Sequence, residues 1–430
     1  MTWISSTETE KWCENNTFSE QPGKEIKIGK EIGKPIYGFG CCISEICAKA
    51  ILSLEPEKKD AVFQELFDPK KSAYTFCRLS IGANDFAESW YSYNEHEGDY
   101  AMKYFSIDRD QKYIIPAIRE AQKYAKDITF FASPWSPPTW MKFPKVYNYG
   151  QMVMTDENLR AYALYLKKYL ESYKKENINI VQLHVQNEIF ADQKFPSCVW
   201  TGEQLRRFIA DYLIDAIGDM AQIWFGTVNG PEDIPDDISG HTLVTRHNQF
   251  LNYVMQDPKC AAAIKGASYQ WAGKFGITQA KEDYPELDTI NSECECGDGR
   301  NTWRYAMYTY EMLHHYFRHG ARANVYWNMA LEPGGLSTWG WNQNSLITVN
   351  NGDYTFNPDF YCIKHFSHFV KPGAIMLETA GNFSSNTTVF RNPDGGIVAV
   401  IQNPFDTEKV ISLCNKNYVL KPYSFNTITV

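Results

Sequence analysis

The stretch INIVQLHVQNEI, from Ile178 to Ile189, decides the fold. Its apolar, β-branched first part is typical of a strand that is buried on both faces, as in a parallel sheet. The stretch closes on a polar pair, Asn187 and Glu188. Because α/β barrels carry their catalytic groups at the carboxyl ends of their strands, we expect a buried parallel strand here with functional side chains at its end.

Seven further apolar runs alternate with amphipathic segments along the middle of the chain. The helical pattern is clearest over residues 157–178, which follow an N-cap at Thr155-Asp156, and over residues 301–320, which end on a C-cap at Gly320. Eight strands that alternate with helices predict an α/β fold, a (β/α)8 TIM barrel. The seven runs are residues 36–40, 74–82, 128–135, 221–228, 265–271, 287–293 and 323–329.

The two ends of the chain have a different pattern. After Pro372-Gly373 the sequence shows β alternation with turn signals such as Asn-Pro-Asp-Gly-Gly, and residues 23–33 also favour a strand. The C-terminal part is too short to form a full sandwich by itself. We therefore predict a small β-sandwich-like side domain built from both termini, with limits at 1–34, 35–372 for the barrel, and 373–430.

Composition limits the classes of partner. The net charge is −9, and no basic run is present that could release counterions from a phosphate backbone, so we expect no nucleic-acid partner. Aromatic residues make up 15% of the chain, including 12 Trp and 27 Tyr. Aromatic rings stack on the apolar faces of sugars, although the same residues also fill large cores. A carbohydrate substrate fits this composition.

Other classes of site have little support in the sequence. The polar start of the chain lacks the apolar segment of a signal peptide, and no run of about 18 apolar residues predicts a membrane span. The 11 Cys are scattered, and Cys41-Cys42 and Cys294-x-Cys296 lack a second ligand pair at metal-binding spacing. We expect reduced thiols, a cytoplasmic location, and neither a metal nor a cofactor.

A second carboxylate occupies the same kind of position as Glu188, at the end of another predicted strand. It is Glu293, in LDTINSE. Two such carboxylates suffice to cleave a glycosidic bond with general acid help, and Asn187 is placed to bond a sugar 2-hydroxyl. Asp85, just after another strand, suits paired hydroxyls, and Trp135 lies in a proline-rich turn that could present its ring for stacking. Taken singly, each of these residues is more commonly structural.

The motifs around these residues resemble glycoside hydrolase family 30, the glucosylceramidase-like retaining β-glycosidases of clan A. The resemblance runs from GFGCCISE (Gly38 to Glu45) to HFSHFVKPGA (His365 to Ala374), and ASPWSPPTWMK (Ala132 to Lys142) is its most specific part. It implies that Glu188 is the acid/base and Glu293 the nucleophile. The residues that it places in the sugar subsite are Asp85, Trp135, Asn187, Trp327 and Trp339.

Two departures from the family pattern concern the site. Asn187-Glu188 is followed by Ile189 where the family has Pro. The strand-six element, often His-Trp-Tyr in the glucosylceramidases, is Gln270-Trp271-Ala272, so the Tyr that would bond the nucleophile is missing there. We place Gln270 among the substrate-binding residues.

The resemblance implies a retaining β-glycoside hydrolase that acts by double displacement, with β-glucosides as the expected substrates. Within the family, an endo-β-1,6-glucanase and a β-xylosidase are alternatives. From another class, an inactive carbohydrate-binding protein would have lost a carboxylate, whereas Glu188 and Glu293 are both present.

Overall fold

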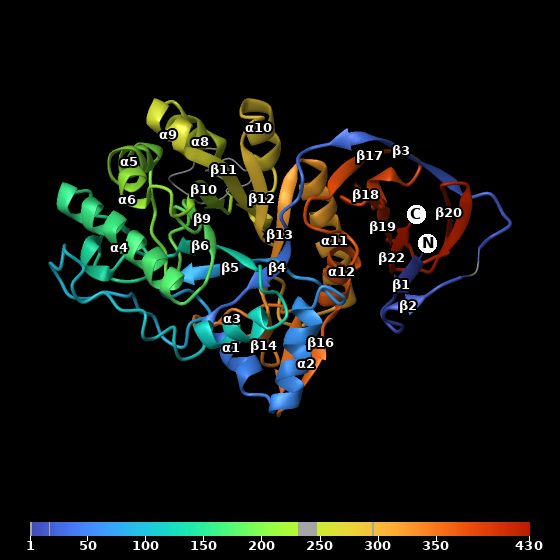
Figure 1. Ribbon diagram of the computed structural model, residues 1–430, viewed down its shortest axis with the longest axis horizontal. Helices are drawn as coiled ribbons and strands as arrows, with labels where there is room; N and C mark the ends of the chain where they lie inside the picture. The colour runs from blue at the N-terminus through green and yellow to red at the C-terminus, as the bar shows by residue number, and fades with distance from the viewer. Residues whose placement is uncertain (1, 17, 231–246, 295) are drawn as a thin grey trace.

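The computed structural model describes residues 2–16, 18–230, 247–294 and 296–430. Its centre is a closed barrel of eight parallel strands, which confirms the predicted (β/α)8 fold (Figure 1). Every predicted run contributes one strand. In chain order they are β4 (Gly38–Cys42), β5 (Phe76–Ile81), β6 (Thr129–Pro134), β9 (Ile180–His184), β10 (Gln222–Val228), β11 (Ile264–Gln270), β12 (Asp288–Glu293) and β13 (Ala321–Asn328).

The deciding stretch is only partly a strand. β9 ends at His184, and the following residues form an irregular segment and a turn that contains Asn187 and Glu188. Glu188 has a φ of +50°, a left-handed conformation that is uncommon for a residue with a side chain. Glu188 therefore lies in the turn that follows β9, beyond the end of the strand.

Helices surround the barrel, and the two predicted most clearly are present. α4 has its N-cap at Thr155, whose hydroxyl accepts from the Asn158 amide, and α11 is followed by Gly320 at φ +92°. A π-helical turn (Ile209–Leu213) joins α5 to α6. The described helices are α1 (Glu45–Leu52), α2 (Pro56–Phe67), α3 (Ile114–Gln122), α4 (Asp156–Lys175), α5 (Gly202–Phe208), α6 (Ile214–Ile217), α8 (His247–Met255), α9 (Pro258–Ala263), α10 (Gly276–Asp283), α11 (Trp303–Arg318) and α12 (Pro358–Ser367).

An apolar floor fills the barrel beneath the site. It is made of Phe76, Phe131, Trp224, Ile290, Ala323 and Val325, from five of the strands. Side chains of a strand alternate between its two faces, so a residue two positions after a floor residue also points into the barrel. Arg78 follows Phe76 in this way, and Ser133 follows Phe131. Polar groups therefore stand on a packed base at the carboxyl ends of the strands.

The side domain is a nine-stranded, mostly antiparallel sheet to which both termini contribute, as predicted. β1 pairs with β22, and β3 pairs with β17, so the chain ends lie close together in Figure 1. The sheet has its own core, which includes Trp3, Leu377 and Ile428. In hydrogen-bonding order the strands are β2 (Cys13–Glu14), β1 (Thr2–Ser6), β22 (Ser424–Thr429), β19 (Ile397–Asn403), β18 (Thr387–Arg391), β17 (Ile375–Gly381), β3 (Lys24–Ile32), β20 (Lys409–Leu413) and β21 (Lys416–Leu420).

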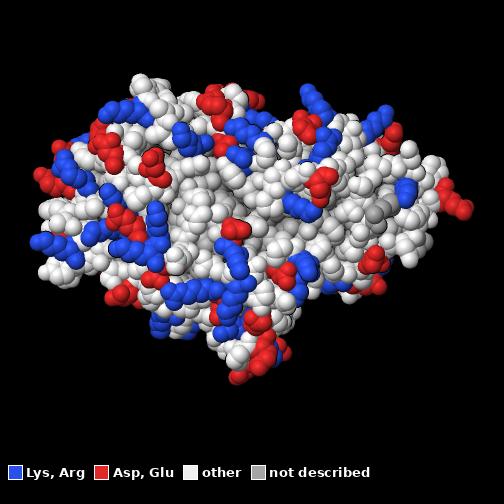
Figure 2. Space-filling view, viewed as in Figure 1, with Lys and Arg blue, Asp and Glu red and all other residues white. Residues whose placement is uncertain are grey.

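The described residues also form two small sheets outside the barrel strands. One contains β14 (Ala330–Leu331), β15 (Ile347–Asn350) and β16 (Asp353–Phe356), and the other is the hairpin of β7 (Lys142–Phe143) and β8 (Gln151–Met152). Acidic and basic side chains are interspersed over the face seen in Figure 2. Among the described helices, none has the length and apolar character needed to cross a membrane. The predicted domain limits and cytoplasmic location stay predictions.

Candidate active site

A cavity of about 170 Å³ lies at the carboxyl ends of the barrel strands. It contains both predicted catalytic carboxylates and four of the predicted sugar-binding residues: Glu188, Glu293, Asp85, Trp135, Trp327 and Trp339. The lining residues that were not predicted to belong to the site are Gln193, Phe195, Asn229, Trp271, Cys296, Trp341 and Gln343. Several of these lie in loops, where strand periodicity gives no signal.

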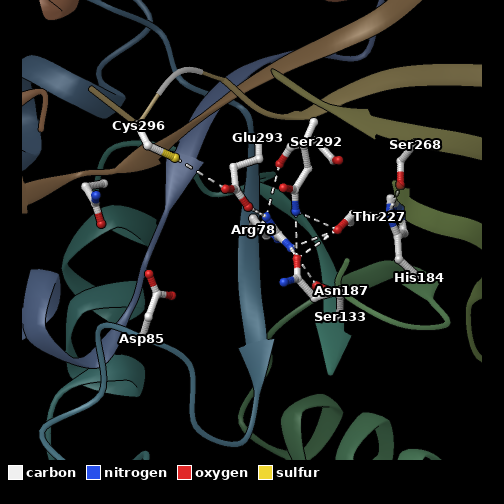
Figure 3. A network of polar contacts seen from close by, with 12 residues as sticks. Arg78, Asp85, Ser133, His184, Asn187, Thr227, Ser268, Ser292, Glu293 and Cys296 are labelled. Atoms are coloured by element: carbon white, nitrogen blue, oxygen red, sulfur yellow. Dashed lines mark hydrogen bonds and ion pairs between the residues drawn. The ribbon is translucent and has the colours of Figure 1, made fainter. Parts of the chain in front are cut away.

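Glu293 is the last residue of β12 and forms an ion pair with Arg78 of β5. Nη1 of Arg78 donates to Oε2 of Glu293 at 2.5 Å, and the Cys296 thiol lies 3.6 Å from Oε1 (Figure 3). Arg78 is fully buried, and its guanidinium also lies over the Trp135 ring at 4.5 Å. A charge-assisted bond of this length stabilises the ionised form of the carboxylate.

Sequence reasoning missed Arg78, although a signal was present. Arg78 interrupts the apolar run YTFCRLSIG in a strand whose six residues are all buried. A charge in such a position is costly unless it is paired, so an Arg within a buried strand indicates a buried acidic partner. The sequence does not tell which of the other strands supplies that partner.

The surroundings of Glu188 differ from those of Glu293 in their hydrogen bonds. Its side chain is buried, and its Oε2 accepts no hydrogen bond from any residue that the structure describes. Burial raises the pKa of Glu188 well above the usual range, and the negative charges of Glu293 and Asp85 raise it further. Glu188 is therefore suited to hold a proton while Glu293 is ionised.

Asp85 is the third carboxyl of the cavity. Burial first, and then the charge of Glu293, raise the pKa of Asp85 to about 7. Nε2 of Gln343 donates to Oδ2 of Asp85 at 3.4 Å, and the Gln343 side chain is itself held by Asn328. The bond from Gln343 is long, which leaves Asp85 acceptor capacity for a bound hydroxyl group.

Aromatic rings wall the cavity. Trp135 and Trp327 are stacked with centroids 5.4 Å apart, and Phe195, Trp339 and Trp341 form a second group with neighbouring centroids 5.6 and 5.5 Å apart. Carboxylates set between aromatic walls can bind the hydroxyl groups of a sugar while the rings contact its C–H faces.

Comparison with known proteins agrees with this geometry. The model of the glycosyl hydrolase family 30 TIM-barrel domain matches residues 36–370. The chain belongs to this family. It is therefore a glycosidase, as predicted.

Relatives of this family 30 chain include a glucosylceramidase and endo-1,6-β-glucanases. It is 25% identical over 401 residues to the lysosomal acid glucosylceramidase of Mus musculus, with 86% of this chain and 75% of the relative covered. It is 24% identical over 412 residues to an endo-1,6-β-D-glucanase of Trichoderma harzianum, covering 88% and 79%. The solved structure of an endo-β1,6-glucanase superposes with a TM-score of 0.86 at 22% identity, covering 100% of this chain and 99% of the other.

Two predicted substrate-binding residues of this family 30 chain do not line the cavity. Gln270 is fully buried, and its Nε2 donates to Oδ1 of Asn187 and to Thr227, so the structure places Gln270 against these two residues and not in the cavity lining. Asn187 itself is almost fully buried. Ile189, where relatives carry Pro, is buried in the turn, and Glu188 still lines the cavity.

Within residues 2–16, 18–230, 247–294 and 296–430, no three His, Cys, Asp or Glu side chains are grouped so that they could hold a metal ion. The chemistry that the described side chains offer is proton transfer and nucleophilic attack by carboxylates.

Proposed function

We propose that this family 30 enzyme hydrolyses β-glucosides with retention of configuration, with Glu293 as nucleophile and Glu188 as acid/base. One observation carries the proposal: two carboxyl groups of one cavity have opposite surroundings. Glu293 bonds Arg78 at 2.5 Å, whereas Glu188 is buried with a raised pKa. Glycosidases need one ionised and one protonated carboxyl group at the scissile bond.

The reaction proceeds in two displacements. A carboxylate oxygen of Glu293 attacks the anomeric carbon, the bond to the leaving oxygen breaks, and that oxygen takes the proton of Glu188. Glu188, now ionised, then removes a proton from water, which attacks the anomeric carbon and releases Glu293. Arg78 stabilises Glu293 as the free carboxylate at the start and end of the cycle. The Trp135 and Trp327 rings contact the sugar faces.

The size of the cavity favours a single bound sugar. Its volume of about 170 Å³ is below the roughly 300–1,000 Å³ of ordinary small-molecule pockets. A cavity of this small size suits an enzyme that removes one terminal residue, and the murine glucosylceramidase relative supports a β-glucoside. Endo-β-1,6-glucanase activity is the second candidate, because one relative and one structural neighbour carry that name.

Product analysis tests the reaction. Proton NMR during hydrolysis of an aryl β-glucoside should show the β-anomer of glucose first, and early appearance of the α-anomer would refute retention. Glu188→Ala with added azide should yield a β-glycosyl azide, while Glu293→Gln should give no azide product of that configuration. With β-1,6-glucan oligomers, release of glucose alone supports the closed pocket, and mixed oligosaccharides support the endo mode.

A further inference from the structure

Three donors converge on a single oxygen behind the cavity, Oδ1 of Asn187. Nη2 of Arg78 donates to it at 2.5 Å, the Thr227 hydroxyl at 2.8 Å, and Nε2 of Gln270 at 2.8 Å. Figure 3 shows this oxygen as the meeting point of several dashed lines. Because a guanidinium can only donate, the amide of Asn187 must face Arg78 with its oxygen, and its Nδ2 points elsewhere.

Gln270 takes part in this arrangement with its amide nitrogen, but its amide oxygen is left without a described partner. Its Nε2 donates both to Asn187 and to the Thr227 hydroxyl, at 2.8 Å in each case. Its Oε1 is buried and accepts no hydrogen bond from the described part of the chain. A buried carbonyl oxygen without a donor is destabilising, and such exceptions in native structures call for an explanation. Holding Asn187 in one orientation explains this one.

We propose that Thr227 and Gln270 are positioning residues that fix the Asn187 amide so that Nδ2 is directed at the 2-hydroxyl of the bound sugar. This inference rests on the proposed function and on the prediction from the sequence that Asn187 bonds that hydroxyl. A hydrogen bond to the 2-hydroxyl strengthens in the oxocarbenium-like transition state, so its orientation acts on kcat more than on KM. The role replaces the direct sugar contact that the sequence predicted for Gln270.

The test compares an aryl β-glucoside with its 2-deoxy counterpart, using the full chain. For each variant, the ratio of the two kcat/KM values measures how much the 2-hydroxyl contributes. Thr227→Val removes the hydroxyl at nearly constant shape, and Gln270→Met removes the amide at similar length. In each, the ratio should fall about five- to tenfold, the equivalent of one oriented hydrogen bond. Thr227→Ser keeps the hydroxyl and should retain the wild-type ratio.

This ratio separates positioning from general damage, because a partly misfolded variant loses activity on both substrates equally. Asn187→Ala removes the amide itself, so its ratio gives the value expected when the contribution of the 2-hydroxyl is lost completely. If Asn187→Ala lowers the ratio while Thr227→Val and Gln270→Met leave it at the wild-type value, the positioning inference is overturned and the proposed function stands. If the wild-type enzyme shows no preference for the 2-hydroxyl, the predicted contact between Asn187 and that hydroxyl fails, and the inference fails with it, while the proposed roles of Glu188 and Glu293 stand.

Discussion

Replacing Asp85 with Asn should stabilise the protein at neutral and alkaline pH while impairing its activity. Asp85 is 4% exposed, and its pKa is raised from the usual 3.8 to about 7. Each pKa unit corresponds to about 1.4 kcal/mol, so keeping this carboxylate ionised in the folded state costs up to about 4 kcal/mol. Asn has nearly the same shape and stays neutral at every pH.

The size of this effect depends on pH. Below pH 3.8 the carboxyl is protonated in both folded and unfolded states, so the variant gains nothing. Between pH 4 and 7 the unfolded chain releases the proton while the folded protein keeps it, which progressively favours unfolding of the wild type. Above pH 7 the difference is constant. The stability gained by Asp85→Asn should therefore rise from near zero at pH 4 to a plateau above pH 7.

Urea unfolding followed by tryptophan fluorescence, at pH 4 to 9, measures this difference. Asp353→Asn, at an exposed carboxylate, is the matched control and should give no rising profile. A gain that does not change with pH, or a loss of stability above pH 7, would show that the surroundings of Asp85 do not disfavour its charge. Activity on an aryl β-glucoside should fall in the same variant, because a charged acceptor binds hydroxyl groups more strongly than an amide does.

Three further predictions concern the other charged groups. Glu293→Gln should reduce turnover of an aryl β-glucoside by several orders of magnitude, and near-normal activity would exclude it as the nucleophile. Arg78→Met leaves Glu293 buried without its cation, so urea unfolding should show a loss of about 3–5 kcal/mol, and the acid limb of the kcat/KM profile should move to higher pH; an unmoved limb would contradict the pairing. The raised pKa of Glu188 should set the alkaline limb of that profile, since catalysis needs its proton, and Asp85→Asn should shift this limb to lower pH by removing a negative charge. An unshifted limb would assign it to another group.

The sequence predicts the barrel well because strand burial and helix amphipathicity are local patterns. All eight runs became strands, and the side domain formed from both ends as expected. The pairing of Arg78 with Glu293 is not local, since 215 positions separate the two residues. It depends on which inward-facing positions of β5 and β12 meet above the apolar floor. The buried setting of Gln270 escaped prediction for the same reason, because a strand-end residue can face either the cavity or the ring of polar groups beneath it.

The different surroundings of the two proposed catalytic carboxyl groups follow from the backbone segments that hold them. Glu293 belongs to β12 itself, so it stands level with the inward-facing side chains of other strands, and Arg78 is among them. Glu188 lies in the turn after β9, with its backbone amide bonded to Thr227 O and its φ at +50°. A left-handed conformation is unfavourable for a residue with a Cβ, and strain of this kind gathers at functional sites. In this turn Oε2 of Glu188 accepts no hydrogen bond from a described residue, whereas Glu293 is bonded to Arg78.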